Sequence, residues 1–452
     1  MKLKPYPKYK DSGVPWLGEV PEHWEQRRVG TVFKLGRGRV IDKGEMIDNP
    51  GLYPVYSSQS KNNGIMGYLN SYDFDGEFIT WTTDGAYAGT VFRRRGKFNC
   101  TNVCGTLYPR IKEIDLTYVH YSLGLGTSYF VRYDINPKLM NNVMARIPFP
   151  FPPFNEQQQI ARYLDWKTAL INKFIRNKRR LIQLLKEQKQ NIINQAVTKG
   201  INPNVEMKDS GVEWLGQIPA HWEVRRIKSL SQVKRGASPR PIVADKYFDQ
   251  NGEYAWVRIS DVSANGKYLE YTTQQLSELG KSKSVPLQPE SIFLSIAGSV
   301  GKPTITKIKC CIHDGFVYFP DYKYNVEYLY YVFLSGNLWN GIGKLGTQLN
   351  LNTGTVGAVS IGLPPNSEQQ EIVTYIEKET ALIDKTISRT EREIELIQEY
   401  RSRLVSDVVT GKLDVRGIAV PEVAEEELLM IDDEDVTESD DIMADAELDD
   451  EE

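Results

Sequence analysis

Cysteine and histidine are scarce in this chain, whose 452 residues include four of each. The cysteines Cys100, Cys104, Cys310 and Cys311 are too few for the disulfide scaffold of a small secreted domain. Their spacing, even with His313 beside the second pair, also lacks the four ligands of a structural zinc site. We therefore expect four buried free thiols and no metal.

Long apolar runs are absent as well. No stretch approaches the roughly 18 apolar residues that a membrane span needs. The first ten residues, MKLKPYPKYK, contain no apolar segment of the kind found in signal peptides. We therefore expect a cytoplasmic protein without a membrane partner.

The motifs of several enzyme classes are missing. Residues 298–302 resemble the end of a phosphate-binding loop, but Ile296 stands at its first glycine and Pro303 at its Ser or Thr. Residues 36–38 lack the third glycine of a dinucleotide fingerprint. The Asn-Pro-Pro-aromatic signature of an adenine methyltransferase does not occur. We expect a chain with no catalytic residues and no cofactor of its own.

The net charge of −4 conceals two regions of opposite sign. Residues 421–452 contain 17 of the 59 acidic residues and no Lys or Arg, which leaves 42 acids against 55 bases, a charge of +13, in residues 1–420. A basic body favours a polyanionic partner. The acidic segment has little apolar content, so a tail at 413–452 is predicted to be disordered.

The chain contains an internal duplication. Residues 11–28, DSGVPWLGEVPEHWEQRR, return 198 positions later as DSGVEWLGQIPAHWEVRR at 209–226. Residues 151–160, FPPFNEQQQI, return 212 positions later as LPPNSEQQEI at 363–372. This period is far too long for a solenoid, so each copy should be one globular segment followed by one long helix. We expect the repeated His23 and His221 to anchor a segment rather than to perform acid–base chemistry twice.

The segments between the repeated motifs, 29–150 and 227–362, show little similarity to each other. Repeated motifs that flank two dissimilar segments indicate one architecture that carries two different specificities. Residues 78–83 and 89–92, which flank a turn at Asp84 and Gly85, are typical of strands, as are 254–259 and 291–296. We predict an α+β fold: two globular domains with curved β-sheets, each followed by one long helix, and then the disordered tail.

Each PP-x-x-EQQ-x-I motif is predicted to begin one of these helices, with Asn155 and Ser367 as N-caps and Gly200 and Gly411 just beyond the ends. About 43 residues would extend on the order of 65 Å. Apolar residues recur at steps of three, four and seven, the pattern of a coiled coil, and an ordinary core helix is the alternative. The predicted helix–helix contacts are Ile160, Leu164, Ile171, Phe174, Leu181 and Leu185 in the first helix and Ile383, Ile387, Ile394, Ile397 and Leu404 in the second.

Basic side chains interleaved with aromatic and amide residues mark both variable segments as candidate DNA interfaces. Arginine commonly reads guanine, Asn and Gln read adenine, and lysine mostly contacts phosphate. For any single position a solvated charged surface is the alternative. The candidates are Arg37, Arg39, Lys61, Arg93, Arg94, Arg95 and Lys97 in the first segment and Lys234, Arg235, Arg240, Arg258, Lys302, Lys307 and Gln348 in the second.

The paired GV-x-WLG-x-x-P-x-HWE segments and the paired PP-x-x-EQQ-x-I helix starts resemble those of type I restriction-modification specificity subunits, over residues 1 to about 415. The resemblance implies two target-recognition domains, each reading one half of a split, asymmetric DNA site. It also implies that the two long helices pack antiparallel, separate the domains and hold them at a fixed distance. The implied order is a first repeat and recognition domain at 1–153, a spacer helix at 154–200, a second repeat and recognition domain at 201–365, a second spacer helix at 366–412, and the tail.

The resemblance also implies partners. These are double-stranded DNA, two methyltransferase subunits that bind S-adenosylmethionine and methylate adenine, and motor-nuclease subunits that use ATP and Mg. The residues alone leave two other functions open: a DNA-binding nuclease with a degenerate active site, and a protein adaptor that uses its helices and does not read DNA.

Overall fold

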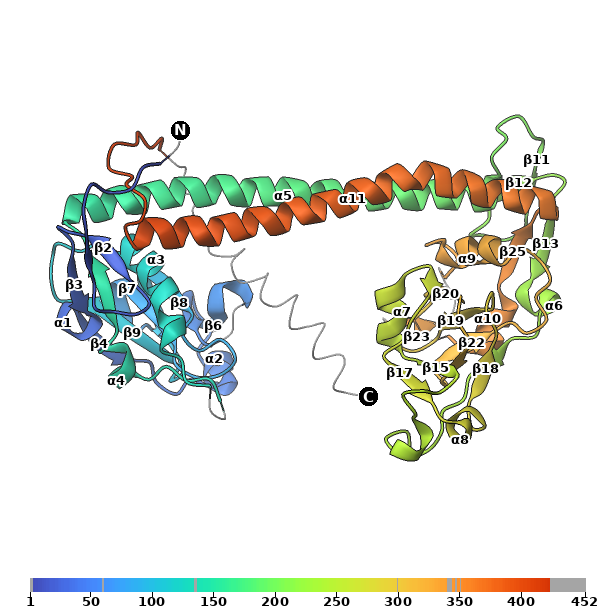
Figure 1. The fold of residues 1–452 in the computed structure, drawn as a ribbon, viewed down its shortest axis with the longest axis horizontal. Coiled ribbons are helices and arrows are strands. Elements are labelled where there is room, and N and C mark those ends of the chain that lie inside the picture. Colours follow the sequence, from blue (N-terminus) through green and yellow to red (C-terminus); the bar gives the residue numbers. More distant parts are fainter. Residues whose placement is uncertain are drawn as a thin grey trace. The chain divides into compact units, whose positions relative to one another are not determined.

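The computed structural model describes residues 3–58, 61–133, 136–298, 300–339, 344–345, 348–349 and 351–422. The chain divides into two compact units, unit 1 with residues 1–179 and 392–452, and unit 2 with residues 180–391. Each unit combines one globular sheet domain with a part of both long helices, α5 (Phe154–Lys199) and α11 (Asn366–Val409) (Figure 1). The predicted acidic tail lies outside the described residues from 423 onward.

The sheet domain of unit 1 contains six strands in the order β4-β9-β7-β8-β5-β6. These strands are β4 (Phe33–Arg37), β5 (Tyr53–Tyr56), β6 (Ile65–Leu69), β7 (Phe74–Thr82), β8 (Val91–Cys100) and β9 (Cys104–Pro109). The predicted strands on either side of Asp84 and Gly85 are confirmed as parts of β7 and β8. The helical elements are α1 (Val29–Val32), α2 (Lys43–Asp48), η1 (Lys61–Gly64), α3 (Leu116–Gly126), η2 (Thr127–Tyr129) and α4 (Asn141–Met144). Helix α3 packs against β7 and β8.

The sheet domain of unit 2 contains a five-stranded sheet, β14-β22-β19-β20-β16, and a four-stranded sheet, β17-β15-β21-β18. The strands are β14 (Lys234–Arg235), β15 (Tyr254–Val257), β16 (Tyr268–Leu269), β17 (Gln274–Leu276), β18 (Val285–Leu287), β19 (Ile292–Ser295), β20 (Pro303–Thr306), β21 (Cys310–Ile312) and β22 (Phe316–Tyr318), with a hairpin of β23 (Lys344–Leu345) and β24 (Gln348–Leu349). The helical elements are α6 (Ile227–Leu230), η3 (Asp245–Tyr247), α7 (Ile259–Asn265), α8 (Glu278–Lys281), α9 (Val326–Leu334) and α10 (Thr353–Ala358). Helix α9 packs against β20 as α3 packs against β8.

The two sheet domains share much of one strand topology although their sequences differ. Arg37 of β4 pairs with Gly105 of β9, and Arg235 of β14 pairs with Val317 of β22. Arg235 lies 198 positions after Arg37, and Val317 lies 212 positions after Gly105, so both repeat offsets continue into the variable segments. The hairpin β7–β8 corresponds to β19–β20, and the parallel pair β5–β8 corresponds to β15–β21. The extra residues of the second domain therefore lie between β14 and β19.

The duplicated motifs form the same short strand pairs in both units. In each unit the Pro-x-His-Trp motif begins at the end of a two-stranded ribbon and is followed by a strand that pairs with the strand before the long helix. The ribbons are β1 (Tyr9–Asp11) with β2 (Glu19–Pro21) and β11 (Met207–Asp209) with β12 (Gln217–Pro219). The pairs before the helices are β3 (Glu25–Arg28) with β10 (Pro148–Phe151) and β13 (Glu223–Arg226) with β25 (Ser360–Leu363).

The long helices run antiparallel in the part of them that each unit contains. In unit 1 the Lys178 ammonium lies 2.7 Å from the Glu393 carboxylate, and Arg401 donates to Asn172 at 2.9 Å. Moving from one contact to the next, the residue number therefore increases in α11 while it decreases in α5, as in antiparallel helices. Unit 2 has an ion pair of the same kind between Lys189 and Asp384, at 2.6 Å.

The buried stripe of α5 differs in part from the predicted one. Phe174 and Leu181 are 41% and 38% exposed, whereas Ile175 and Ile182 are buried. A step of three or of four residues keeps a side chain near the same helix face, so the pattern alone does not tell which of two adjacent apolar residues faces the partner. Of the other predicted positions, Leu185 and Ile397 are half-buried, and the buried ones are Ile160, Leu164, Ile171, Ile383, Ile387, Ile394 and Leu404.

Both long helices begin two residues earlier than N-caps at Asn155 and Ser367 would place their first helical residue. Because α5 begins at Phe154 and α11 at Asn366, Asn155 and Ser367 lie in the first turn, and the prediction that they are N-caps was wrong. The ends agree with the prediction: Gly200 directly follows α5 with φ of 71°, and Gly411 lies two residues beyond α11 with φ of 77°.

The segment after α11 is packed in unit 1 up to residue 418, so the tail begins later than the predicted residue 413. The Asp414 amide donates to the carbonyl of Lys4 at 2.8 Å. The Gln159 side chain donates to the carbonyls of Val415, at 3.0 Å, and Ile418, at 2.7 Å, and Val415 is fully buried.

All four cysteines are free and buried, as predicted, and burial raises the pKa of the Cys310 thiol to about 12. Among the described residues, no helix combines the length and the apolar character that crossing a bilayer requires.

Candidate DNA interface and the joints that position it

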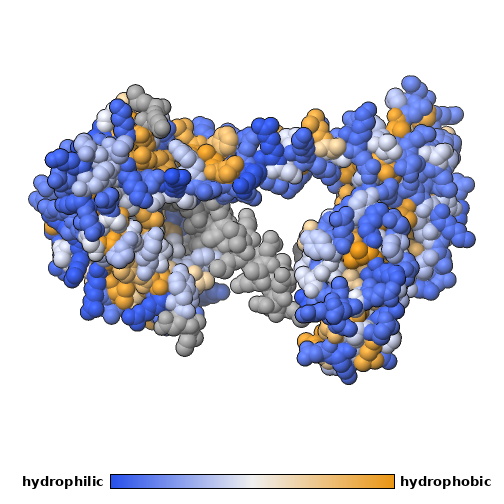
Figure 2. All heavy atoms as spheres, in the orientation of Figure 1, coloured by the Kyte–Doolittle hydropathy of each residue, from blue (hydrophilic) through white to orange (hydrophobic). Residues whose placement is uncertain are grey.

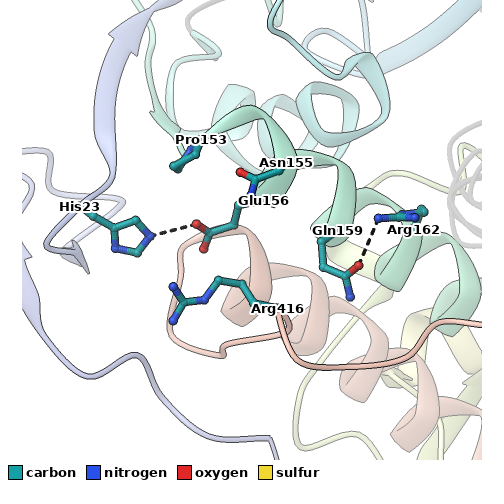
Figure 3. Close-up of a pocket in the computed structure, with 7 residues that line it drawn as sticks. All are labelled: His23, Pro153, Asn155, Glu156, Gln159, Arg162 and Arg416. Atoms are coloured by element: carbon teal, nitrogen blue, oxygen red, sulfur yellow. Dashed lines mark hydrogen bonds and ion pairs between the residues drawn. The ribbon is translucent and has the colours of Figure 1, made fainter.

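A glutamate at the start of each long helix joins that helix to the Pro-x-His-Trp motif of the same unit. In unit 1 the buried Glu156 carboxylate accepts hydrogen bonds from Tyr6 Oη at 2.5 Å and Trp24 Nε1 at 3.1 Å. His23 Nε2 lies 2.9 Å from its second oxygen (Figure 3). Arg416 lines the same polar pocket, which has a volume of about 450 Å³ (Figure 3).

We call this set of contacts, between the glutamate at the helix start and the Pro-x-His-Trp motif, the joint of each unit. The joint of unit 2 has the same arrangement with one partner fewer. Glu368 accepts from Trp222 Nε1 at 3.0 Å, and His221 Nε2 lies 2.7 Å from its second oxygen. Its side chain is 20% exposed, compared with 4% for Glu156. Both repeated histidines therefore hold a segment in place, as the sequence predicts.

The glutamine after each glutamate secures the same helix start to the sheet domain. Gln157 accepts from the amide of Asp115 at 3.0 Å and donates to the carbonyl of Pro152 at 2.9 Å. Gln369 makes the matching pair of bonds in unit 2, with the Asn325 amide at 3.1 Å and the Pro364 carbonyl at 2.8 Å. The duplicated Glu-Gln pair thus fixes how each sheet domain sits on its helix start.

Replacing Glu156 with Ala should destabilise unit 1 by about 3 kcal/mol, because it leaves the buried Trp24 and Tyr6 donors without an acceptor. The same change at Glu368 should cost about half as much, since that site has fewer partners and more exposure. Urea unfolding followed by tryptophan fluorescence measures both. The exposed Glu22→Ala variant is the control, and equal losses at all three positions would contradict the assigned role of the joint.

Strand alternation removes one predicted residue from the DNA interface. Arg94 is 3% exposed, its guanidinium lies 3.7 Å from the centre of the Tyr56 ring and 4.3 Å from that of Phe92, and it donates to Asn63 at 2.7 Å. Successive side chains of a strand point to opposite faces, so Arg94 points into the domain while its two neighbours point outward. Arg94 is a packing residue, and its prediction as a DNA contact was wrong.

Several other candidates in the first domain are accessible but already have polar partners. Arg95 pairs with Glu77 at 2.8 Å, and Arg93 donates to Thr117. Both line a surface pocket of about 530 Å³ with Arg110 and Lys112, two basic residues that the sequence reasoning missed.

Arg39 and Lys97 are also engaged. Arg39 pairs with Glu45 at 2.6 Å and Asp73 at 3.0 Å, and the hydrogen bond with Glu45 raises its pKa. The Lys97 ammonium lies 4.4 Å from the centre of the Tyr72 ring. The side chains of Lys61 and Gln348, also predicted, lie outside the described part of the chain.

The candidates of the second domain show a similar mixture. Lys307 pairs with Glu290 at 2.9 Å and Arg240 with Asp314 at 2.9 Å. Three further candidates have no described ion pair: Lys234 is exposed, Arg258 donates to Gln274 at 2.6 Å, and Lys302 is half-buried with a pKa lowered by that burial. Residues 298–302 connect β19 to β20, so a strand follows them where a phosphate-binding loop requires a helix.

Arg37 and Arg235 occupy one equivalent position at the ends of β4 and β14, and both are exposed. Sequence comparison missed this equivalence, together with the partners of Glu156 and Glu368. The glutamates were visible as part of a repeated motif, but their partners lie more than 130 positions away.

Comparison with known proteins agrees with this architecture. The family model described as the type I restriction modification DNA specificity domain matches the chain twice, at residues 21–187 and 219–396. A putative type I specificity subunit of Mycoplasma pneumoniae is 28% identical over 392 residues, which cover 85% of this chain and 98% of that protein. The specificity subunit of a type I restriction enzyme of Methanocaldococcus jannaschii is 27% identical over 434 residues, which cover 88% and 95%.

A solved structure from work on complex assembly and conformational transition of the type I restriction-modification system has a TM-score of 0.65 to this chain. The alignment covers 87% of this chain and 99% of that one at 14% identity, so this likeness concerns the fold. Two related sheet domains, each joined to a part of the same two long helices, define a duplicated protein with two domains of one topology. Because the family model covers more than half of its length, the chain belongs to the type I restriction-modification specificity subunits, with two target-recognition domains.

Proposed function

We propose that this chain reads DNA for a type I restriction-modification complex, each target-recognition domain binding one half of a bipartite, asymmetric site. The observation that carries the proposal is the pair of domains with matching strand pairs but different exposed side chains. A shared backbone presents both domains to the duplex in similar ways, while different side chains meet different base edges. The charge of +13 on residues 1–420 supports a polyanionic partner.

The chemistry belongs to partner subunits in this proposal. Methylation of adenine requires the base to leave the stack and enter an active site. Among the described residues, no group of three or more His, Cys, Asp and Glu is placed to hold a metal ion. We assign S-adenosylmethionine to methyltransferase subunits, and ATP and Mg to motor-nuclease subunits. The specificity subunit determines which adenine is presented. Family membership favours this function over a nuclease or an adaptor that does not read DNA.

Exposed leucines on the long helices support the docking of two methyltransferase subunits. Leu170 and Leu396 of unit 1 are 46% and 48% exposed, and Leu184 and Leu382 of unit 2 are 45% and 72% exposed. Leu170 is related to Leu382 by the repeat, and Leu184 to Leu396. Figure 2 shows apolar residues at the surface of the helical part. Each unit thus has one exposed leucine on each of the two long helices, which suits one partner copy per unit.

Charged substitutions in one leucine pair should remove one methyltransferase copy. Leu170→Glu with Leu396→Glu, or Leu184→Glu with Leu382→Glu, should each weaken one site at least about tenfold, because a buried carboxylate without a partner is costly. The four changes together should abolish assembly. Native mass spectrometry counts the bound copies, with the exposed Gln195→Glu as control. Two copies retained on the fourfold variant would exclude this surface.

Exchange of one recognition domain tests the reading of half-sites. Replacing residues 29–147 with the corresponding segment of a relative keeps the frame strand β3 and the whole of its partner, β10. Only one half of the methylated site should change, because the second domain keeps its own side chains. Sequencing of methylated DNA from cells that also express the methyltransferase subunits gives the site directly. A change in both halves would contradict independent recognition, and unchanged halves would exclude the first domain as a reader.

A further inference from the structure

The turn after β4 and the turn after β14 have the same backbone structure in the two domains. The Gly38 amide donates to the Cys104 carbonyl at 3.0 Å, and the Gly236 amide donates to that of Phe316 at 2.9 Å. The next amide in each turn donates at 3.1 Å to the carbonyl of a second repeat-related pair, Cys100 and Ile312. The turn is therefore one structural element present twice, inside segments whose sequences otherwise differ.

Packing explains the glycine of this turn. A Cβ atom on Gly38 would lie 2.2 Å from the Cys100 carbonyl oxygen, and one on Gly236 would lie 2.1 Å from that of His313. Backbone atoms cannot yield to such a contact, so only glycine fits.

Packing does not explain the arginine before each glycine. Arg37 and Arg235 are exposed, and within the described part of the chain neither forms an ion pair. Their Nε atoms donate to backbone carbonyls, of Asn102 and Asp314 respectively, which are again repeat-related. The Asp314 carboxylate itself accepts from Ser238 and Arg240.

A second repeat-related pair of cations provides the contrast. Arg95 and Lys307 occupy equivalent positions 212 apart, and each has an acidic partner, Glu77 or Glu290. Each of these cations therefore has its acidic partner within its own domain. The arginines of the turn are held at Nε and form no ion pair with an acid in the described structure, although the pKa of Asp314, lowered first by the Ser238 hydrogen bond, is also lowered by the charge of Arg235. Holding a guanidinium at Nε leaves its terminal nitrogens available for an external anion.

We propose that Arg37 and Arg235 each bind a backbone phosphate of DNA, at the same position in the two target-recognition domains. This inference rests on the proposed function, that the domains read DNA. A phosphate is favoured over a base because the two domains differ in their other candidate contacts, so a residue common to both suits the part of DNA that is common to every sequence.

The test compares Arg37→Gln and Arg235→Gln with the controls Arg27→Gln and Arg225→Gln, in the full chain assembled with its methyltransferase subunits. These two control residues are also repeat-related cations, and they pair with Glu25 and Glu223. Each turn variant should weaken binding about tenfold, equally on a duplex carrying the mapped site and on a random duplex. It should also reduce the slope of log K against log salt by about 0.9, while the methylated site stays the same. The controls should change binding much less, because their charges are already paired. Arg37→Lys should weaken binding by an intermediate amount, since lysine keeps the positive charge but lacks the two parallel N–H donors of the guanidinium.

Three outcomes would contradict the proposal, each at a different step. Relaxed specificity at one half-site would show a base contact and overturn the assignment to phosphate. Unchanged affinity in both turn variants, with thermal stability intact, would exclude these residues from the interface. Absence of DNA binding by the unsubstituted assembly would instead refute the proposed function itself.

Discussion

Insertion of four residues into each long helix, after Arg179 in α5 and after Glu391 in α11, should lengthen the spacer between the half-sites by one to two base pairs. Both points lie at the boundary between the two units. Four helical residues add about 6 Å and turn the helix by about 400°, so the apolar stripe stays nearly in phase. One base pair rises about 3.4 Å, which gives the expected change. Both half-sites should keep their sequences.

The antiparallel contacts explain why both helices must be extended. Lys178 pairs with Glu393 on one side of the insertion points and Lys189 with Asp384 on the other. An insertion in one helix alone would shift these partners past one another. Sequencing of methylated DNA gives the spacer length. Two-residue insertions at the same points rotate the stripe by about 200° and should abolish site-specific methylation. An unaltered spacer in an active four-residue variant would show that the helices do not set the distance.

Deletion of residues 421–452 should strengthen binding to random DNA by about tenfold or more at low salt. The deletion changes the net charge from −4 to +13, and non-specific binding is mainly electrostatic. The structure supports this deletion point because residues 414–418 make contacts in unit 1 that should be kept. The recognised site should be unchanged, since both target-recognition domains remain complete.

A tail of the same length with its 17 acids replaced by Asn and Gln separates charge from chain length. It should behave like the deletion, and the difference from the full chain should shrink as salt rises. Equal affinity of all three proteins for random DNA at low salt would contradict the electrostatic explanation. Loss of site recognition in the deletion variant would indicate a structural role for the tail.

Local sequence determined the elements whose signals are short-range or duplicated. The two long helices were predicted from their Pro-Pro starts, their apolar steps and the glycines Gly200 and Gly411 at their ends. Strands β7 and β8 were predicted because β-branched and aromatic residues flank the turn at Asp84 and Gly85. The duplication and the division into a basic body and an acidic tail required only comparison of the chain with itself.

Whether a candidate side chain in a strand or a long helix is buried or exposed depends on tertiary packing, which sequence patterns do not specify. Arg93, Arg94 and Arg95 are adjacent and chemically identical, yet only Arg94 is buried, because the pairing of β8 sets which face its side chain meets. The exposed Phe174 beside the buried Ile175 is the helical counterpart: both lie near one stripe, and the position of the other helix selects between them.

The sequence by itself determined that this protein is a duplicated pair of α+β domains with two long helices, because each repeated motif carries its own local signals. Only the tertiary structure decided that the two unlike segments share a strand topology, and that Glu156 and Glu368 hold the joints. It also placed Arg37 and Arg235 at one equivalent position. The reason is physical: strand register and buried hydrogen bonds join residues far apart in the chain, and many different side chains can satisfy the same backbone pairing.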